Sequence, residues 1–241
     1  MVSVSKSAVA AACAALAALS VLAERSEART SSVTSQVAAV IVEGKAHVID
    51  GDTLVIAGQS IRLEGIDAPE FKQLCTKTGV GGGIWPAGRV ATDSLQRWVR
   101  DAVVRCRVVG RGRYGRLLGR CATAGVDLNA AMIRHGLAWA FLKYSQTFVA
   151  DERRARAAGV GVWSASCQTA WDYRANRWRD VAGRAPAGCA IKGNVSRKGR
   201  IYHMPWGNWY GRTRIDTGKG ERWFCNEAEA IRAGWRPAVV R

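Results

Sequence analysis

Short apolar runs alternate with turn residues over positions 48–70 of the chain. Val48-Ile49 leads into Asp-Gly-Asp, Leu54-Val55-Ile56 follows, and Gly58-Gln59 precedes a third run in which apolar and polar residues alternate. Runs of this length, bounded by Asp-Gly and Gly-Gln, are typical of short antiparallel strands joined by tight turns. Pro69 then ends regular strand pairing, because it cannot donate a backbone hydrogen bond.

Three later segments have the spacing and the boundary residues of helices. In residues 86–100 the apolar positions follow a helical period, and a proline suits the first turn. A second helix is predicted over 128–135 with Asp127 as its N-terminal cap, and a third, charged helix over 147–158. Residues 103–109 alternate as a strand does. This order of strands and helices predicts a domain of the α+β class.

The C-terminal part differs from the rest in pattern. Residues 167–188 form a basic, aromatic extension that ends in Ala185-Pro186-Ala187-Gly188, a composition typical of a hinge. Residues 189–241 are predicted to form a small α+β module whose helix is capped by Asn226 together with Glu229. The predicted strands of this module cover residues 191–196, 200–203, 213–215 and 222–225.

The first 28 residues have the pattern of a secretory signal peptide. Lys6 gives a positive start, the apolar run from Ala8 to Ala23 is short for a membrane span, and Ser26-Glu27-Ala28 offers a small-residue cleavage site. An uncleaved N-terminal anchor is the alternative. Residues 29–38 then form a polar linker, and we expect the mature protein to be secreted or periplasmic, with no membrane contact after cleavage.

The chain is strongly basic, which bears on its partner. Its 36 Lys and Arg residues against 19 Asp and Glu residues give a formal net charge of +17. Such a charge favours a polyanionic partner, with nucleic acid as the leading candidate. A basic, soluble surface without a partner gives the same count, so charge alone does not distinguish the two.

Within the strand-rich segment, four acids and one arginine are candidates for a common site: Asp50, Asp52, Arg62, Asp67 and Glu70. Asp52 begins a predicted strand and Asp67 ends the next, so the two carboxylates can converge on a hard cation, which prefers oxygen ligands. Glu70 can hold a water molecule beside that cation, and Arg62 can bind a phosphate oxygen in bidentate geometry. Turn acids with a solvated arginine are the alternative interpretation, since Asp-Gly is common in turns.

The string D-G-D-T at 50–53, followed by R-L-E-G-I-D-A-P-E at 62–70, resembles the signature of the staphylococcal nuclease (thermonuclease) family. The run Y-G-R-L-L at 114–118 matches a second motif of that family, and the likeness covers roughly residues 45–165. The resemblance implies an OB-fold, a five-stranded β-barrel with three helices, within residues 39–166. It also implies hydrolysis of phosphodiester bonds in DNA or RNA, with products that end in 3′-phosphates.

The resemblance assigns a cation site as well. Asp52, Asp67 and the backbone carbonyl of Ala68 would hold one calcium ion. The family usually has threonine where Ala68 stands, and a carbonyl ligand tolerates that change. Asp50 is then expected next to the ligands rather than among them. A ligand set of oxygen atoms without His or Cys is consistent with calcium.

The chemistry assigned by the resemblance rests on three side chains. Glu70 would orient or deprotonate the attacking water, and Arg62 with Arg116 would stabilise the charge that develops on the phosphate. Substrate contacts are expected from Arg113, Tyr114 and Tyr144. A nucleic-acid-binding OB-fold without catalysis is the alternative, because OB-folds often bind single strands without cutting them. The presence of every acid and arginine of the signature favours the enzyme.

Six cysteines remain once Cys13, inside the predicted signal peptide, is set aside, and an even number in an exported chain favours disulfides. Zinc is the competing interpretation, but the chain has no C-x-x-C pair and only three histidines. The expected pairs are Cys106–Cys121 across a predicted hairpin, Cys189–Cys225 around the C-terminal module, and Cys75–Cys167 by elimination. The partner of Cys75 stays open, because many exported members of the family have a second cysteine near residues 85–87.

The C-terminal module contains the strings I-K-G-N-V-S, I-Y-H-M-P and E-R-W-F-C-N-E-A-E-A. These strings resemble a small module found at the ends of exported bacterial nucleases, sometimes called a sunset domain. An accessory binding role and a purely stabilising role are both open. No stable protein partner is implied, and we expect a monomer.

Overall fold

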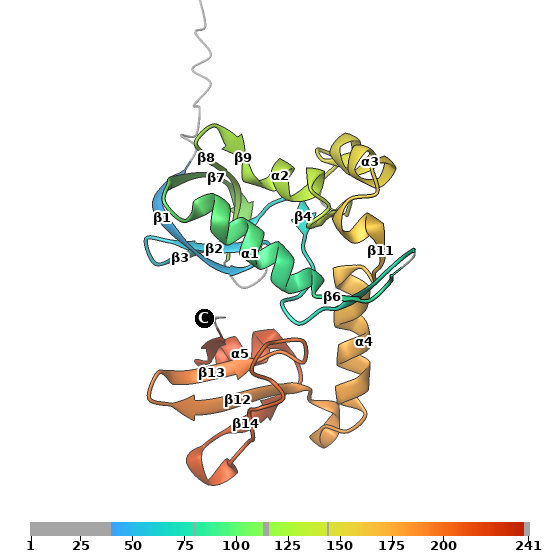
Figure 1. Ribbon diagram of the computed structural model, residues 1–241. Coiled ribbons are helices and arrows are strands. Elements are labelled where there is room, and N and C mark those ends of the chain that lie inside the picture. Colours follow the sequence, from blue (N-terminus) through green and yellow to red (C-terminus); the bar gives the residue numbers. More distant parts are fainter. Residues whose placement is uncertain (1–39, 80, 113–115, 144, 239–241) are drawn as a thin grey trace, which may run out of the picture. The chain divides into compact units, whose positions relative to one another are not determined.

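The computed structural model describes residues 40–79, 81–112, 116–143 and 145–238 (Figure 1). The predicted signal peptide and linker lie outside these residues, as do Arg113, Tyr114 and Tyr144. In the part of the chain that is described, no helix is long and apolar enough to cross a lipid bilayer.

Five strands close into a barrel. Their order around it is β3-β2-β1-β7-β8, and a parallel pairing of β3 with β8 joins the two ends (Figure 1). The other neighbours in the ring are antiparallel. This closed barrel confirms the predicted OB-type architecture of the α+β class. The strands are β1 (Ile41–Asp50), β2 (Thr53–Ile56), β3 (Gln59–Leu63), β7 (Val103–Arg111) and β8 (Leu117–Thr123).

The β2–β3 hairpin illustrates how the sequence produces the barrel. Its loop is Ala57-Gly58, and these residues have φ values of 48° and 76°. Two residues with positive φ form a type I′ turn, whose twist matches that of the flanking strands. Leu54, Ile56 and Ile61 then lie in the main hydrophobic core, where all three are completely buried.

Three helices accompany the barrel, as predicted. One face of α1 contributes Ala91, Leu95 and Val99 to the main core. The Asp127 side chain accepts a hydrogen bond from the Ala130 N–H (3.0 Å) and so caps the start of α2. The bounds are α1 (Ala87–Val99), α2 (Leu128–Arg134) and α3 (Val149–Ala157), within one or two residues of the predicted ones.

Minor strand pairings fix the loops around the barrel. The pairing of β4 with β10 matters most for the site, because it sets Asp67 opposite Trp139. In addition, β5 lies between β6 and β11, and β9 pairs with β8 in antiparallel orientation at the edge of the sheet. These elements are β4 (Ile66–Asp67), β5 (Cys75–Lys77), β6 (Ile84–Trp85), β9 (Val126–Asp127), β10 (Trp139–Ala140), the 3₁₀ turn η2 (Gly161–Ser164) and β11 (Ala165–Ser166).

The extension after the barrel forms a helix, α4 (Ala170–Ala182), that we did not predict. Thr169 caps its start by accepting a hydrogen bond from the Asp172 N–H (3.3 Å). Arg174, one turn after Trp171, has a side chain that is only 22% exposed. A helix is normally predicted from a stripe of apolar residues on its buried side. Here an arginine occupies that side, so the apolar pattern is interrupted.

The C-terminal module has a four-stranded sheet in the order β14-β12-β13-β15. Asn226 caps its helix as expected, by accepting a hydrogen bond from the Glu229 N–H (2.9 Å). The module has its own core, made of Ile191, Tyr202, Phe224, Ala230 and Trp235. Its elements are β12 (Ile191–Ser196), β13 (Gly199–His203), β14 (Arg222–Phe224), α5 (Glu227–Arg232) and β15 (Arg236–Pro237), with the 3₁₀ turns η3 (Pro186–Gly188) and η4 (Thr217–Lys219).

One predicted strand of the module, at 213–215, is wrong, because that segment has no strand pairing. Lys192 Nζ donates instead to the backbone carbonyls of Tyr210 (3.1 Å) and Thr213 (2.6 Å). The ammonium group thus takes an acceptor that a sheet would use. An alternating sequence predicts a strand only where a neighbouring strand is available to pair with it.

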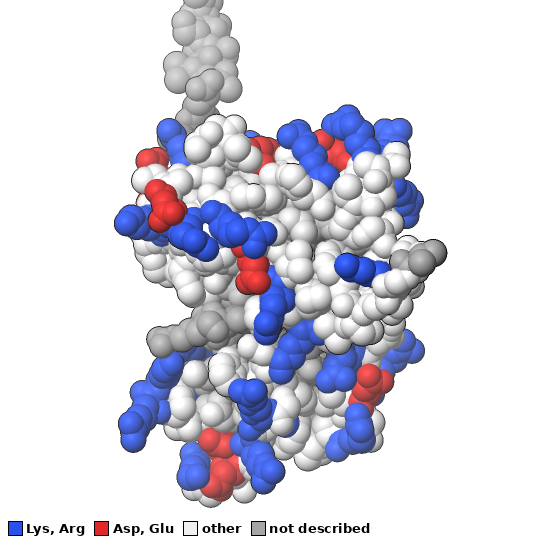
Figure 2. All heavy atoms as spheres, viewed as in Figure 1, with Lys and Arg blue, Asp and Glu red and all other residues white. Residues whose placement is uncertain are grey.

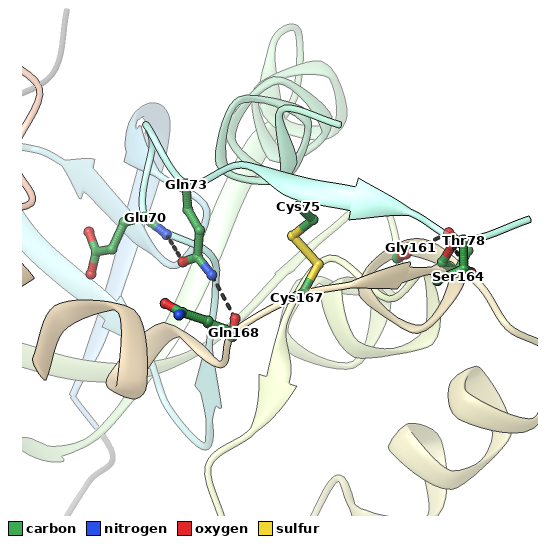
Figure 3. The surroundings of a disulfide bond; sticks show 8 residues. All are labelled: Glu70, Gln73, Cys75, Thr78, Gly161, Ser164, Cys167 and Gln168. Carbon is green, nitrogen blue, oxygen red and sulfur yellow. Dashed lines mark hydrogen bonds between the residues drawn. A yellow bond between two sulfur atoms is a disulfide. The ribbon is translucent and has the colours of Figure 1, made fainter. Parts of the chain in front are cut away.

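The three predicted cysteine pairs are all bonded in the structure. Cys106 and Cys121 are opposite each other across β7 and β8, as the hairpin predicted. Cys75, at the start of β5, is bonded to Cys167, just after β11 (Figure 3). The open question about the partner of Cys75 is therefore answered. The Cys189–Cys225 bond closes the module.

We expect the Cys75–Cys167 bond to stabilise the protein more than the Cys106–Cys121 bond. The bonded residues are 92 and 15 positions apart, respectively. Loop-closure entropy corresponds to about 4.5 and about 3 kcal/mol for loops of these lengths. Urea unfolding of the two double alanine variants, compared with the parent, measures the difference. A larger loss of stability in Cys106→Ala/Cys121→Ala would contradict the expectation.

Candidate active site

The barrel strands bring the first acids of the signature next to Arg62. β1 ends at Asp50, the turn Gly51-Asp52 leads into β2, and the register between β2 and β3 sets Thr53 opposite Arg62. The Leu63 N–H donates to the Asp52 carbonyl (2.8 Å), which holds the turn against β3. A turn acid and a strand arginine are therefore neighbours because of the hairpin register.

Asp52 is almost completely buried, and its carboxylate is well supplied with donors. Its Oδ1 accepts from the Thr53 hydroxyl (3.0 Å) and from Arg62 Nη1 (2.9 Å), and its Oδ2 accepts from the Ala68 N–H (3.0 Å). Burial by itself would raise the pKa of Asp52, but the charge of Arg62 and the Ala68 N–H outweigh burial and hold this pKa below its usual value. Asp52 is therefore ionised in the folded protein.

Asp67 is completely buried between two guanidinium groups. Arg62 Nη2 donates to its Oδ1 (2.6 Å). Arg174 donates to both oxygens, from Nη1 to Oδ1 (3.0 Å) and from Nη2 to Oδ2 (2.7 Å). Arg174 Nη1 also donates to Glu70 Oε1 (2.8 Å). Arg62 thus links Asp52 to Asp67, and Arg174 links Asp67 to Glu70.

Two of the acids hold a proton more tightly than a free carboxyl group does. Burial, together with the charges of Asp52 and Glu70, raises the pKa of Asp50 to about 8. Burial also raises the pKa of Glu70 to about 7, although the nearby Arg174 opposes that shift. If Asp50 and Glu70 both lose their protons, four carboxylates face only two arginines, and one more cation would compensate the excess negative charge.

Three of the four acids, Asp50, Asp52 and Glu70, line a small pocket next to two close backbone approaches at glycines. Its free volume is about 10 Å³, which is room for one water-sized particle. A Cβ at Gly51 would lie 2.7 Å from the Ala68 Cβ, and a Cβ at Gly88 of α1 would lie 1.7 Å from the Glu70 carbonyl oxygen. Only glycine allows such an approach. The lining residues are Asp50, Gly51, Asp52, Ala68, Pro69 and Glu70.

The donor atoms around the pocket fit a hard divalent cation. Asp50, Asp52 and Glu70 line it with carboxylate oxygens, and the backbone of Ala68 adjoins Asp52 through its N–H. Asp67 lies behind the lining residues and is joined to Asp52 through Arg62. The lining residues include no His or Cys, and oxygen ligands suit calcium or magnesium rather than zinc. Among the described residues, no three acidic, His or Cys side chains converge into a ready-made metal cage. The Asp67 oxygens are bonded to guanidinium groups instead.

The closure of the barrel places the second predicted arginine beside the first. β3 and β8 pair in parallel with Arg62 opposite Leu118, and Arg116 immediately precedes β8. Arg116 is exposed, and its charge adds to the effect of Arg62 on the pKa of Asp52. The other predicted substrate contacts, Arg113, Tyr114 and Tyr144, lie outside the described residues, so their roles stay predictions.

Arg174 is the residue of this cluster that sequence analysis missed. It lies 107 positions after Asp67 and outside every motif that carries the family resemblance. Its only signal in the sequence is an arginine at a helical spacing from Trp171, a pattern that many exposed helices share. The contact could be found only once α4 and the barrel were both in place.

The fold and the site together indicate a class of protein. An OB-type barrel that brings carboxylates and arginines together has the groups that a hydrolase acting on phosphodiesters needs. Comparison with known proteins narrows this class. The family described as staphylococcal nuclease homologue matches residues 60–165. The chain is 34% identical over 143 residues to succinoglycan biosynthesis protein ExoI of Rhizobium meliloti (strain 1021), which covers 58% of this chain and 74% of that protein.

Two further relatives have names that state an activity. An uncharacterized endonuclease of Escherichia coli O157:H7 is 35% identical over 125 residues, which cover 49% of this chain and 74% of the relative. The staphylococcal-like nuclease CAN1 of Arabidopsis thaliana is 32% identical over 120 residues, which cover 48% of this chain and 33% of the relative. The chain belongs to the staphylococcal nuclease family and is a nuclease of the hydrolase class.

We expect Gly88→Ala to destabilise the protein, although alanine normally favours a helix. Alanine is about 1 kcal/mol better than glycine inside a helix. At this position, however, the methyl group would overlap the Glu70 carbonyl oxygen, and overpacking of this kind costs about 1–3 kcal/mol. Urea unfolding gives the sign of the change. The matched control is Gly83→Ala, where a methyl group meets no atom within 4 Å. A Gly88→Ala variant as stable as the parent would refute this account.

Proposed function

We propose that this nuclease is exported, depends on calcium, and cleaves phosphodiester bonds of DNA, RNA or both to leave 3′-phosphate ends. The observation that supports the proposal most directly is the arginine bridge, in which Arg62 donates to Asp52 (2.9 Å) and to Asp67 (2.6 Å). The three residues come from a turn, from β3 and from β4. These residues therefore meet because the whole barrel brings them together. Unrelated acids that merely stand in turns would have no reason to converge on one arginine.

In this proposal, calcium is held by Asp52, Asp67 and the Ala68 carbonyl, with Asp50 beside them. When bound, the ion supplies positive charge that polarises the phosphate. The fit of the donors, all of them oxygen atoms, supports this choice over a transition metal.

The remaining roles belong to three side chains. Glu70 lines the same pocket and takes the proton of the attacking water. Arg62 and Arg116 donate hydrogen bonds to phosphate oxygens as negative charge develops, and one preorganised donor of this kind typically contributes about 3–4 kcal/mol. Arg113, Tyr114 and Tyr144 are proposed to contact the flanking nucleotides.

The surface supports a polyanionic substrate. Figure 2 shows Lys and Arg side chains distributed over the visible face, with fewer Asp and Glu side chains among them. Together with the net charge of +17, this surface attracts a phosphate backbone in a salt-dependent manner. Three disulfides support a secreted or periplasmic location. We propose that the protein acts as a monomer.

The cation requirement can be tested directly. Calcium should support cleavage of single- or double-stranded nucleic acid, and excess chelator should abolish it, because the carboxylates cannot coordinate the phosphate themselves. The measurement is cleavage rate against free calcium concentration, with magnesium and manganese as comparisons. Full activity in excess chelator would defeat the cation assignment.

The catalytic roles predict a separation of cleavage from binding. Glu70→Gln should lower turnover by about 10²–10⁴-fold, the usual contribution of a positioned general base, and should leave nucleic-acid affinity equal or slightly higher. Arg116→Ala should lower turnover far more than affinity, because many other basic residues still attract phosphate. Both quantities are measured at one stated salt concentration.

Two control variants make this test specific. Glu43→Gln makes the same change of charge on β1, where Glu43 is exposed and faces Arg105 at 3.8 Å, and should leave turnover unchanged. Arg113→Ala should weaken binding modestly and preserve turnover at saturating substrate. Tight binding without any turnover in the parent protein would instead favour a binding OB-fold.

A further inference from the structure

Arg174 makes three hydrogen bonds to a proposed cation ligand, Asp67, and to the proposed base, Glu70, yet it belongs to neither the barrel nor the family motifs. Two of these bonds hold Asp67, at 2.7 and 3.0 Å, and the third holds Glu70 at 2.8 Å. The family match ends at residue 165, before α4 begins. The cluster of acids and arginines in this chain therefore includes one residue of its C-terminal extension.

The segment immediately before α4 is fixed to the loop that carries Glu70, so the helix that carries Arg174 starts from an anchored position. The Gln73 amide accepts a hydrogen bond from the Glu70 N–H (3.2 Å) and donates one to the Gln168 carbonyl (2.6 Å) (Figure 3). Gln73 is only 1% exposed. The Cys75–Cys167 bond adds a covalent link beside this bridge.

Aromatic packing holds the first turn of α4 itself. The Trp171 ring lies 6.2 Å from that of Trp139, the residue paired with Asp67, and 5.7 Å from that of Phe141. Ala170, at the start of the helix, is completely buried. Since the start of α4 is held in this way, a change of partners by Arg174 would be a movement of its side chain and not of the helix.

We infer that Arg174 is a positioning residue that holds Asp67 and Glu70 together and competes with the divalent cation for the Asp67 carboxylate. This inference rests on the proposed function of the pocket. Both Asp67 oxygens accept N–H groups of Arg174, and Oδ1 also accepts one from Arg62. A cation that binds one of those oxygens repels the guanidinium group beside it, so we expect Arg174 to withdraw from that oxygen when a cation binds.

The charges of the acids explain why an arginine that can change its partners is useful here. Asp67 is completely buried, and a buried carboxylate that loses its partner is strongly destabilising. Arg174 compensates Asp67 and Glu70 when they have no cation beside them. Once a cation supplies the compensation, the arginine becomes dispensable for Asp67 and retains Glu70 as its partner.

The test is calorimetric titration of calcium chloride into the full chain without nucleic acid. Arg174→Gln should bind calcium about tenfold more tightly than the parent, the effect of removing one charge-assisted hydrogen bond that competes for the ligand. Its melting temperature in chelator should fall, and the rise in melting temperature on adding calcium should exceed that of the parent. Neither readout requires cleavage.

The control variant is Arg177→Gln, which removes the same charge from α4. Arg177 lies beyond the pocket and is 40% exposed, with Asp180 as its ion-pair partner at 3.9 Å. Its calcium affinity should change much less than that of Arg174→Gln. Equal tightening in both variants would mean that only overall charge matters, and would overturn the inference.

Unchanged or weaker calcium binding in Arg174→Gln would also overturn it, because Arg174 would then be a simple support for Asp67. If Arg174→Gln does not fold, the calcium affinity of Arg174→Lys is measured instead. One ammonium group cannot reproduce all three bonds, so this variant should bind calcium more tightly than the parent, by less than tenfold. Calcium binding by the variant but not by the parent would support competition, and binding by neither would refute it. Cleavage by the parent, assayed separately in calcium and in chelator, tells whether the proposed function has failed as well.

Discussion

Compensation of buried negative charge is the constraint on which this structure depends. Asp52 is 3% exposed and Asp67 is 0% exposed, and buried carboxylates persist only with partners that supply both charge and hydrogen bonds. Arg62 serves both acids at once, because its planar guanidinium group presents separate N–H groups to each. The turn after β1 and the strand β4 are thus held to β3 by the residues that are proposed to bind cation and phosphate.

The barrel decides which side chains reach this point. The β2–β3 hairpin is a local structure, but β8 joins β3 only after β7 has crossed back along β1. That closure sets Arg116 at the end of the strand beside Arg62. The Cys106–Cys121 bond joins β7 to β8, so it stabilises the hairpin that carries Arg116. Stability of the barrel and the geometry of the pocket therefore depend on the same strands.

The sequence suggests that the barrel domain ends before α4, but Arg174 of α4 is bonded to acids of the site. α4 follows the residues that match the family, yet Gln73 and the Cys75–Cys167 bond connect the segment just before this helix to the loop of Glu70. An extension fixed in this manner can alter the electrostatics of a pocket whose main residues are shared by a whole family. The C-terminal module, by contrast, has a separate core around Phe224 and Trp235.

The sequence by itself determined the barrel strands, the helices α1 to α3 and the acids around Arg62, because these depend on local period, turn residues and a compact motif. Only the tertiary structure showed α4 and the bonds of Arg174, which join positions 104 and 107 residues apart. The strand expected at 213–215 failed for a related reason, since Lys192 takes the carbonyl of Thr213. An arginine on a helix has the same local pattern whether it faces solvent or a buried carboxylate, and only the packing of distant segments decides which partner it finds.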